Sequence, residues 1–307
     1  MLDLAPGGDA LLDLVVCPQC KSTLSGFDEC DGCGTGFVPS DTRPSLIPDS
    51  ATAVFPYMFT SKRSVAGPAF QEALRYPPLP TAASDLPYHL DAAHAKVLDE
   101  LPSGSSVLDV GCGGGQMREH LTRRGIKYMG VDITAGERVG EELRVHGGPD
   151  LLCDAHFLPF PDDQFDVVYS AGCVEHLACP HRVAQEVRRV LKPGGQYMGS
   201  VSFLEPWHDD SFFHMTPLGV FEMLAQADLV PEYIWPGRGY TGFNAIMILG
   251  NKATVKARFL GKLNSAIYRA GYRIRNVVRP RPDGTLIMDE ARVSGSTDWI
   301  ARKPALA

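Results

Sequence analysis

The sequence predicts an α/β protein in which helices cover both faces of a doubly wound, mostly parallel sheet, with a small module in front of it. Three observations carry this prediction. Short apolar segments alternate with helical patterns from residue 91 onward, an order that is typical of parallel sheets. Four glycines fall within residues 111–115, directly after the first apolar segment. Two Cys-x-x-Cys pairs precede this region, within residues 17–33.

The overall composition is that of a globular protein. Of the 307 residues, 44% are hydrophobic and 21% are charged, which is the usual balance for a chain with a packed core. The net charge of −7 argues against a nucleic-acid surface over the whole chain. No apolar run reaches the roughly 18 residues that span a bilayer, and the first residues lack the basic segment of a secretory signal. We therefore expect a cytoplasmic protein, with peripheral attachment to a membrane left open.

Residues 11–48 are predicted to form a separate metal-binding module. Its candidate ligands are Cys17, Cys20, Cys30 and Cys33. Four thiolates at this spacing suit tetrahedral zinc, and because they close the coordination sphere the metal would be structural rather than catalytic. The alternatives are reduced thiols without a metal, or a disulfide pair.

Residues 49–90 are predicted to be a linker or cap. Six prolines in this stretch exclude long helices. Its aromatic side chains could line a substrate site or simply pack the linker against the domain that follows, at residues 91–307.

The domain at 91–307 is expected to contain seven strands separated by helices. Helical patterns fall at residues 91–103, 181–191 and 216–227, and the second ends at a Lys-Pro-Gly-Gly stop signal. The strands are predicted at residues 107–110, 128–132, 151–155, 165–170, 196–203, 230–235 and 296–302.

The glycine turn predicts a nucleotide-cofactor site at the carboxyl end of the first strand. A dinucleotide fingerprint would have its third glycine where Gln116 stands. Asp132 ends the second strand and can accept hydrogen bonds from both hydroxyls of a ribose. Asp154 ends the third and can accept one from an adenine amino group, next to the amide of Ala155. A carboxylate that serves adenine is not part of the dehydrogenase pattern.

Six motifs within residues 90–235 occur in the order found in the class I S-adenosylmethionine-dependent methyltransferases, and this region resembles that family. They are Val107 to Gly113, Tyr128 to Asp132, Cys153-Asp154-Ala155 with Leu158-Pro159-Phe160, Phe165-Asp166-Val167-Val168, Val174-Glu175-His176-Leu177 and Leu191-Lys192-Pro193-Gly194-Gly195. The resemblance implies a seven-stranded, Rossmann-like methyltransferase sheet that binds S-adenosylmethionine. It implies cofactor contacts for Asp109, Gly111, Cys112 and Gly113 in the turn, for Asp132 at the ribose, and for Asp154 and Ala155 at the adenine. Asp109 could instead only order the glycine turn.

The N-terminal module carries a second resemblance. Residues 14–21, 30–33 and 43–48 are similar to the zinc ribbons at the front of some methyltransferases, and to free-standing ribbons that activate methyltransferases. The resemblance identifies the module and leaves its role open.

Candidate catalytic residues follow the fourth and fifth strands. Glu175 and His176 are placed at the carboxyl edge of the sheet, where an acceptor must lie, and could act as a general base. His208 belongs to a second cluster, at residues 205–214, whose imidazoles and carboxylates could bind substrate, act as a base or hold a divalent ion. The alternative for Glu175 and His176 is packing beside the cofactor.

Residues 252–281 contain nine lysines and arginines and no acid. Apolar residues at helical spacing predict a basic amphipathic helix, within an insertion at about 245–290. Three interpretations compete: a helix packed on the domain with a solvated basic face, a surface for an anionic partner such as RNA, and a helix resting on membrane lipid.

The sequence thus favours an S-adenosylmethionine-dependent methyltransferase with structural zinc. We expect in-line methyl transfer to a small molecule, such as a specialised metabolite or a lipid- or sugar-linked intermediate. RNA base methylation, motivated by the ribbon and the basic helix, ranks below it. A non-catalytic adaptor that bears the ribbon is a further alternative.

Overall fold

The computed structural model describes residues 8–50, 68–79, 90–134, 146–208, 210–238, 240–249, 255–278 and 285–305. Most of the predicted linker at 49–90 lies outside these ranges. The described part of the linker contains one short helix, α2 (Pro68–Ala73).

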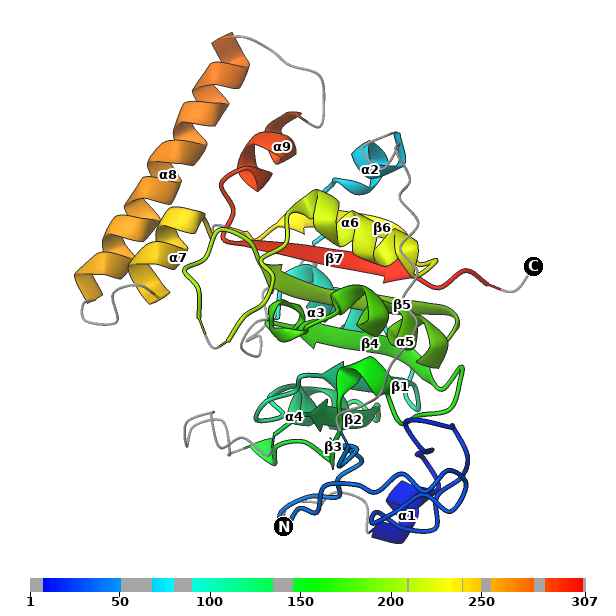
Figure 1. Cartoon of the computed structure of the whole chain (residues 1–307). Helices are drawn as coiled ribbons and strands as arrows, with labels where there is room; N and C mark the ends of the chain where they lie inside the picture. The colour runs from blue at the N-terminus through cyan, green and yellow to red at the C-terminus, as the bar shows by residue number, and fades with distance from the viewer. Residues whose placement is uncertain are drawn as a thin grey trace.

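The core of the molecule is a seven-stranded sheet with the order β3-β2-β1-β4-β5-β7-β6 (Figure 1). The pairs from β3 to β5 are parallel, and β7 is antiparallel to both of its neighbours. The predicted mostly parallel α/β sheet of seven strands is therefore confirmed. The strands are β1 (Ser106–Val110), β2 (Lys127–Asp132), β3 (Leu151–Leu152), β4 (Phe165–Ala171), β5 (Leu191–Ser202), β6 (Val230–Pro236) and β7 (Ser296–Arg302).

Helices cover both faces of the sheet. In Figure 1, α5 lies in front of the central strands, α6 packs on β6 and β7, and α3 lies behind the sheet. The helices of the main domain are α3 (Ala92–Asp99), α4 (Met117–Thr122), α5 (Pro180–Val190), α6 (Pro217–Gln226), α7 (Gly242–Leu249), α8 (Val255–Val278) and α9 (Thr285–Ala291). Two short 3-10 turns, η2 (Ala155–Phe157) and η3 (Val174–His176), follow β3 and β4.

Local sequence explains where the helices begin. The Thr216 hydroxyl accepts a hydrogen bond from the Gly219 amide at 3.0 Å and caps α6. Asp91 caps α3 in the same way, through the Ala93 amide at 2.8 Å. Pro180 occupies the first turn of α5, where its missing N–H has no helical partner to lose.

Two strand boundaries differ by more than one residue from the sequence prediction. β3 ends at Leu152 rather than Ala155, because the Asp154 side chain accepts the His156 amide and caps η2, which turns the chain out of the sheet. β5 begins at Leu191 rather than Gln196, since Leu191 already pairs with Phe165 before the register shifts.

The N-terminal module lies against the β3 edge of the sheet (Figure 1). The Leu46 amide donates to the Leu152 carbonyl, and the Leu152 amide donates to the Pro44 carbonyl, both at 2.9 Å. The ammonium of Lys21 pairs with Glu186 of α5 at 3.2 Å. The module therefore covers a strand edge that would otherwise present unpaired backbone groups.

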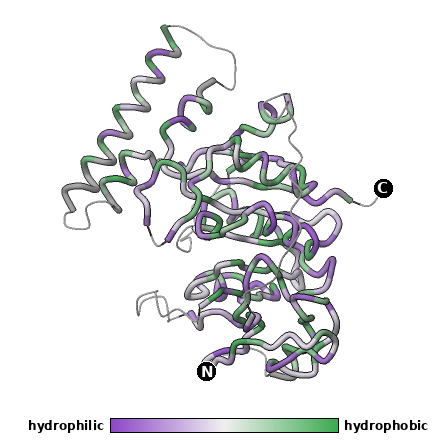
Figure 2. Tube along the Cα trace, viewed as in Figure 1, coloured by the Kyte–Doolittle hydropathy of each residue, from purple (hydrophilic) through white to green (hydrophobic). Residues whose placement is uncertain are grey.

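Figure 2 shows hydrophobic and hydrophilic residues alternating along α8, with no uninterrupted apolar stretch. Among the described residues, no helix is both long enough and apolar enough to cross a membrane.

Candidate functional site

A cavity of about 1090 Å³ opens at the carboxyl ends of the parallel strands. This is the edge where open α/β sheets bind their ligands, between strands whose connections run in opposite directions. The residues that line it are Val110, Gly111, Gly113, Val131, Asp132, Ile133, Cys153, Asp154, Ala155, His156, Gly172, Cys173, His176, Leu177, Ala178, Trp207, Asp210 and Phe212.

The glycine turn forms the floor of this cavity. Gly111 has a φ of +72°, and a Cβ there would meet Cys173 Sγ at 2.5 Å, so a larger residue would clash. Gly113 also has positive φ, but a Cβ there would meet no atom within 4 Å. The backbone at Gly113 therefore faces open space, as close approach of a ligand requires.

Asp132 lines the cavity at the end of β2. Its Oδ2 accepts the Gly113 amide at 2.9 Å, and its Oδ1 accepts the amides of Ile133 and Thr134 at 2.8 and 3.2 Å. Burial raises the pKa of this carboxyl above its usual value, although these three amides oppose the shift. Asp132 thus joins the glycine turn of β1 to the end of β2, with its side chain at the cavity wall.

Asp109 and Cys112 are not among the cavity-lining residues. Both are 5% exposed. Asp109 accepts a hydrogen bond from the Tyr128 hydroxyl at 2.8 Å, and burial raises its pKa to about 7. In this structure, the side chains of these two predicted cofactor residues are therefore buried beside the cavity rather than in its wall.

Asp154 and Ala155 line the far end of the cavity, as the sequence predicts, together with His156. The Asp154 Oδ1 accepts both the His156 amide at 2.9 Å and its Nδ1–H at 2.6 Å. Burial raises the pKa of Asp154, but the His156 hydrogen bonds outweigh burial and hold the pKa below its usual value. His156 Nε2 in turn accepts the Cys179 amide at 3.0 Å. Sequence analysis missed His156, whose only signal is its place two residues after Asp154.

The three predicted catalytic side chains lie together, and one of them reaches the cavity. One donor atom each from Glu175, His176 and His208 falls within 4.8 Å of the others. The rings of His176 and His208 meet edge to face, with centroids 5.5 Å apart. Among these residues, only His176 lines the cavity.

Ser202 and the segment at residues 205–214 hold this cluster in place. The Ser202 hydroxyl contacts Glu175 Oε1 at 2.6 Å, and the Phe212 amide donates to the Glu175 carbonyl at 2.6 Å. Trp207, Asp210 and Phe212 complete the cavity wall. The cluster predicted at 205–214 therefore does lie on the same edge of the sheet, although Asp209 falls outside the described residues.

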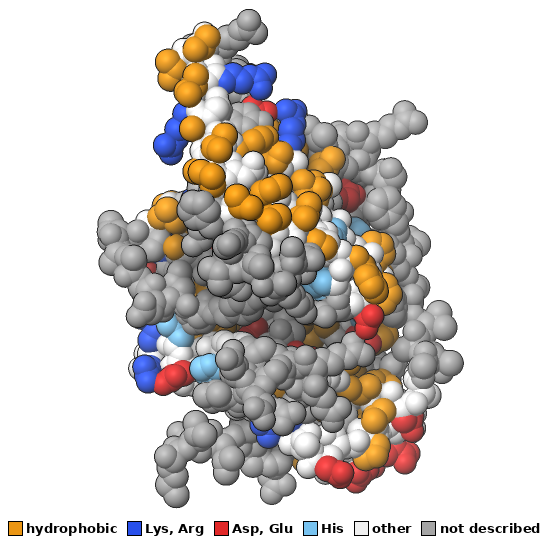
Figure 3. Space-filling model, turned by 90° about the vertical axis from the view of Figure 1, so that its left-hand side faces the viewer, with side chains coloured by type: hydrophobic (Ala, Val, Ile, Leu, Met, Phe, Trp, Pro, Cys, Tyr) orange, Lys and Arg blue, Asp and Glu red, His pale blue; other side chains and the backbone are white. Residues whose placement is uncertain are grey.

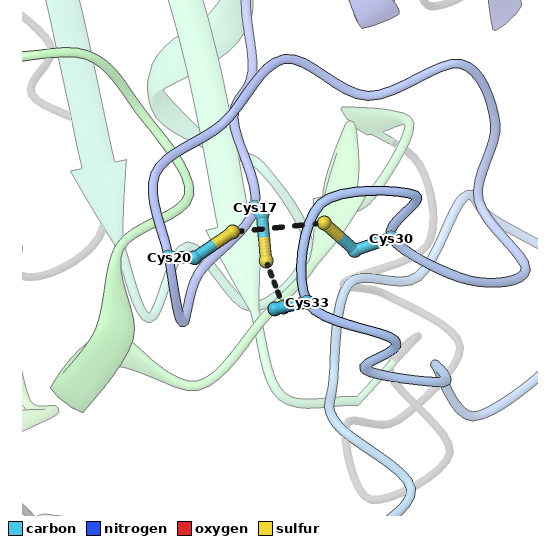
Figure 4. Close-up of side chains that lie close together, drawn as sticks. All are labelled: Cys17, Cys20, Cys30 and Cys33. Atoms are coloured by element: carbon cyan, nitrogen blue, oxygen red, sulfur yellow. Dashed lines mark hydrogen bonds between the residues drawn. The ribbon is translucent and has the colours of Figure 1, made fainter.

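The four cysteines of the N-terminal module converge (Figure 4). Cys17 and Cys33 have their Sγ atoms 3.7 Å apart, and so do Cys20 and Cys30. Four sulfurs bound to one zinc at about 2.3 Å would be separated by about 3.8 Å in a tetrahedron. The Ser22 hydroxyl, 2.9 Å from Cys20 Sγ, lowers the pKa of that thiol to about 6. The donor set and its spacing fit a structural zinc ion.

The predicted basic amphipathic helix is present as α8, although Lys252, Arg279 and Arg281 fall outside the described residues. α8 packs beside α7 (Figure 1). Its described apolar side chains are open to solvent rather than packed on the domain, with Ile267, Ile274 and Val277 exposed to 63, 65 and 81%. Figure 3 shows apolar side chains gathered on this face of the molecule, with lysines and arginines at their margin.

Comparison with known proteins identifies the central segment. Residues 108–199 match a family described as a methyltransferase domain. An uncharacterized methyltransferase of Mycobacterium sp. (strain KMS) is 38% identical over 94 residues, which are 31% of this chain and 37% of that protein. The 2-methyl-6-phytyl-1,4-hydroquinone methyltransferase of Synechocystis sp. is 32% identical over 170 residues, covering 51% of this chain and 50% of that protein.

Among solved structures, phosphoethanolamine N-methyltransferase 2 of Haemonchus contortus, in complex with S-adenosyl-L-methionine, aligns with a TM-score of 0.44 and 19% identity. The alignment covers 68% of this chain and 51% of that one. This chain spans between about a third and a half of the length of the curated relatives that it matches. Residues 108–199, which carry β1, the glycine turn, β2, β4 and the first part of β5, match the methyltransferase domain family.

Proposed function

We propose that this protein is an S-adenosylmethionine-dependent methyltransferase that acts on a small molecule. The observation that carries the proposal is the cavity at the carboxyl edge of the sheet, whose floor is the glycine turn and whose wall is Asp132. Both belong to the segment that matches the methyltransferase domain family.

The residues present fit this cofactor. The cavity of about 1090 Å³ can take the cofactor and an acceptor together. Open space above Gly113 allows close approach to the turn. Gly111 and Gly113 would hold the methionine end, Asp132 the ribose, and Asp154 with the Ala155 amide the adenine. When bound, the cofactor supplies a methyl group already activated by its positive sulfur.

The contribution of the chain is then mainly to position the acceptor. Holding a nucleophile in line with the methyl carbon is worth roughly 7–11 kcal/mol of the barrier. Trp207 and Phe212 offer apolar walls to the acceptor, and His176 offers an imidazole in the lining of the same cavity. A general base is needed only for an acceptor atom that would otherwise keep its proton.

The acceptor that we propose has an apolar part. The phytyl-hydroquinone methyltransferase among the relatives has a name that denotes such an acceptor. The exposed apolar stripe of α8, together with Arg273 and Arg275 on the same helix, suits a surface of anionic lipid. A helix resting on that surface would bring the cavity to a lipid-linked substrate.

Calorimetric titration of S-adenosylmethionine into the full chain tests the proposal. We expect one site per chain, and Asp132→Ala should weaken binding roughly 10–100-fold, because charge-assisted hydrogen bonds to the ribose hydroxyls are lost. Asp162→Ala is the matched control, since this carboxylate is 72% exposed and pairs with Arg189 away from the cavity. Failure of the folded wild type to bind would contradict the proposal and favour an adaptor.

A further inference from the structure

The cluster of Glu175, His176 and His208 contains a buried carboxyl group for which the described residues offer no cationic partner. Glu175 is 2% exposed, and its Oε2 is buried without a hydrogen-bond partner. No arginine or lysine forms a salt bridge with it in the part of the chain that the structure describes. An unpaired buried carboxylate oxygen is costly and calls for a compensating cation or proton.

A second carboxylate sharpens the imbalance. The Ser202 hydroxyl lies 2.6 Å from Glu175 Oε1 and 2.8 Å from Glu205 Oε2. One hydroxyl carries one proton and can donate to only one of these acceptors at a time. Two acidic side chains therefore converge on a donor that cannot satisfy both.

One imidazole is fixed by a hydrogen bond to the backbone, and the other has a buried ring nitrogen without a partner among the described residues. His208 Nδ1 lies 2.9 Å from the Pro206 carbonyl, which can only accept, so Nδ1 carries the proton and Nε2 keeps its lone pair. A metal-ligating histidine is usually fixed by such a bond from its other ring nitrogen. His176 Nδ1 is buried without a hydrogen-bond partner among the described residues.

The geometry points to a binding site for a divalent transition-metal ion at Glu175, His176 and His208. Two imidazoles and one carboxylate, with donor atoms within 4.8 Å of one another, suit Mn²⁺, Fe²⁺ or Zn²⁺. Three protein ligands leave coordination positions open, and His176 places them at the cavity wall. The site would bind an acceptor through an oxygen atom, a role that rests on the proposed methyl transfer, whereas metal binding itself does not.

Manganese is the best probe, because Mn²⁺ prefers oxygen and nitrogen ligands and the four cysteines prefer zinc. The full chain, with zinc supplied, is titrated with MnCl₂, and free Mn²⁺ is followed by its paramagnetic resonance signal. We expect one Mn²⁺ per chain. His208→Ala and Glu175→Gln should each weaken binding at least tenfold, since even residues that only support a ligand contribute 10–100-fold, as a rough guide.

Two features keep the test decisive. Glu175→Gln preserves the shape and the bond to Ser202, and His208 lies on a loop, so at least one variant should fold, as checked by thermal unfolding. His120→Ala, on α4 beside Asp99, is the matched control and should bind Mn²⁺ like the wild type. Absence of Mn²⁺ binding to the folded wild type at millimolar concentration, or undiminished binding in both variants, would overturn the inference.

Titration of S-adenosylmethionine into the same samples separates this inference from the proposed function. Binding of the cofactor without binding of Mn²⁺ would contradict the metal site and leave the proposed methyltransferase function standing. A protein that binds Mn²⁺ and no cofactor keeps the metal site and loses the proposed function.

Discussion

Asp109 shows how one buried carboxyl can make the stability of the fold depend on pH. It lies on β1, two residues before the glycine turn, and accepts the Tyr128 hydroxyl, and burial raises its pKa from 3.8 to about 7. A group with a raised pKa in the folded state contributes stability that is complete below about pH 4 and is lost as the pH rises to about 7. The ionised form is therefore the less stable one in the fold.

Replacing this carboxyl should flatten that dependence. Between pH 5 and pH 8, the free energy of unfolding of the wild type should fall by about 3 kcal/mol more than that of Asp109→Asn, on the basis of this shift. Urea unfolding of both proteins at the two pH values measures the difference. Parallel curves would mean that Asp109 does not titrate in this range.

At the scale of single residues, the sequence predicts where a residue lies in the fold better than it predicts which groups surround it. The ends of β1, β2 and β3 place Gly111, Asp132 and Asp154 at one edge, and the structure finds all three on the cavity wall. The burial of Asp109 could not be predicted, because it depends on Tyr128, which reaches it from the neighbouring strand. The hydrogen bonds of His156 depend on the η2 turn, which no local sequence pattern predicts.

Among the elements, α8 shows which features the hydrophobic periodicity of the sequence can predict and which it cannot. The 3.6-residue repeat predicts an amphipathic helix, and the structure contains one over Val255–Val278. The repeat does not say what covers the apolar side, because that depends on how the helix packs beside α7. In the structure, Ile267 and Ile274 are left exposed. Their exposure favours a partner surface over packing on the domain.

We expect α8 to bind vesicles that contain anionic phosphatidylglycerol. The wild type should sediment with them, less so at high salt, since arginine attraction is screened. Ile267→Glu with Ile274→Glu should weaken binding roughly tenfold or more, because each buried isoleucine contributes roughly 1.5–3 kcal/mol. Leu79→Glu, at an exposed leucine outside α8, is the control. Salt-sensitive RNA binding without vesicle binding would instead favour the RNA interpretation.

For the molecule as a whole, the N-terminal module and the sheet share one packed core. Buried residues of the module, such as Cys17 and Leu46, belong to the same apolar cluster as Leu151 of β3 and Val187 of α5. The convergence of the four cysteines could be predicted from two Cys-x-x-Cys pairs. The docking of the module on β3 could not be predicted, since the spacing of the cysteines does not indicate which strand lies at the edge of the sheet.

Loss of metal from the module should therefore lower the thermal stability of the whole protein. Cys17→Ser should abolish zinc binding and lower the midpoint of thermal unfolding by roughly 5–10 °C, because the ribbon would no longer hold the β3 edge. Metal analysis and calorimetry measure both effects. Cys179→Ser, at a cysteine outside the module, should change neither. A zinc-free variant with an unchanged midpoint would show that the module folds without its metal.

β3 is only two residues long, and it lies between β2 on one side and the arm at residues 44–46 on the other. The residues proposed to hold adenine follow it directly. We infer that the two proposed binding events, of zinc and of the cofactor, both require this strand to be ordered. Linkage then works in both directions: if zinc raises the affinity for the cofactor, the cofactor raises the affinity for zinc by the same factor. We expect the protein to retain zinc best when it is saturated with the proposed cofactor, so that each ligand would protect the other from loss.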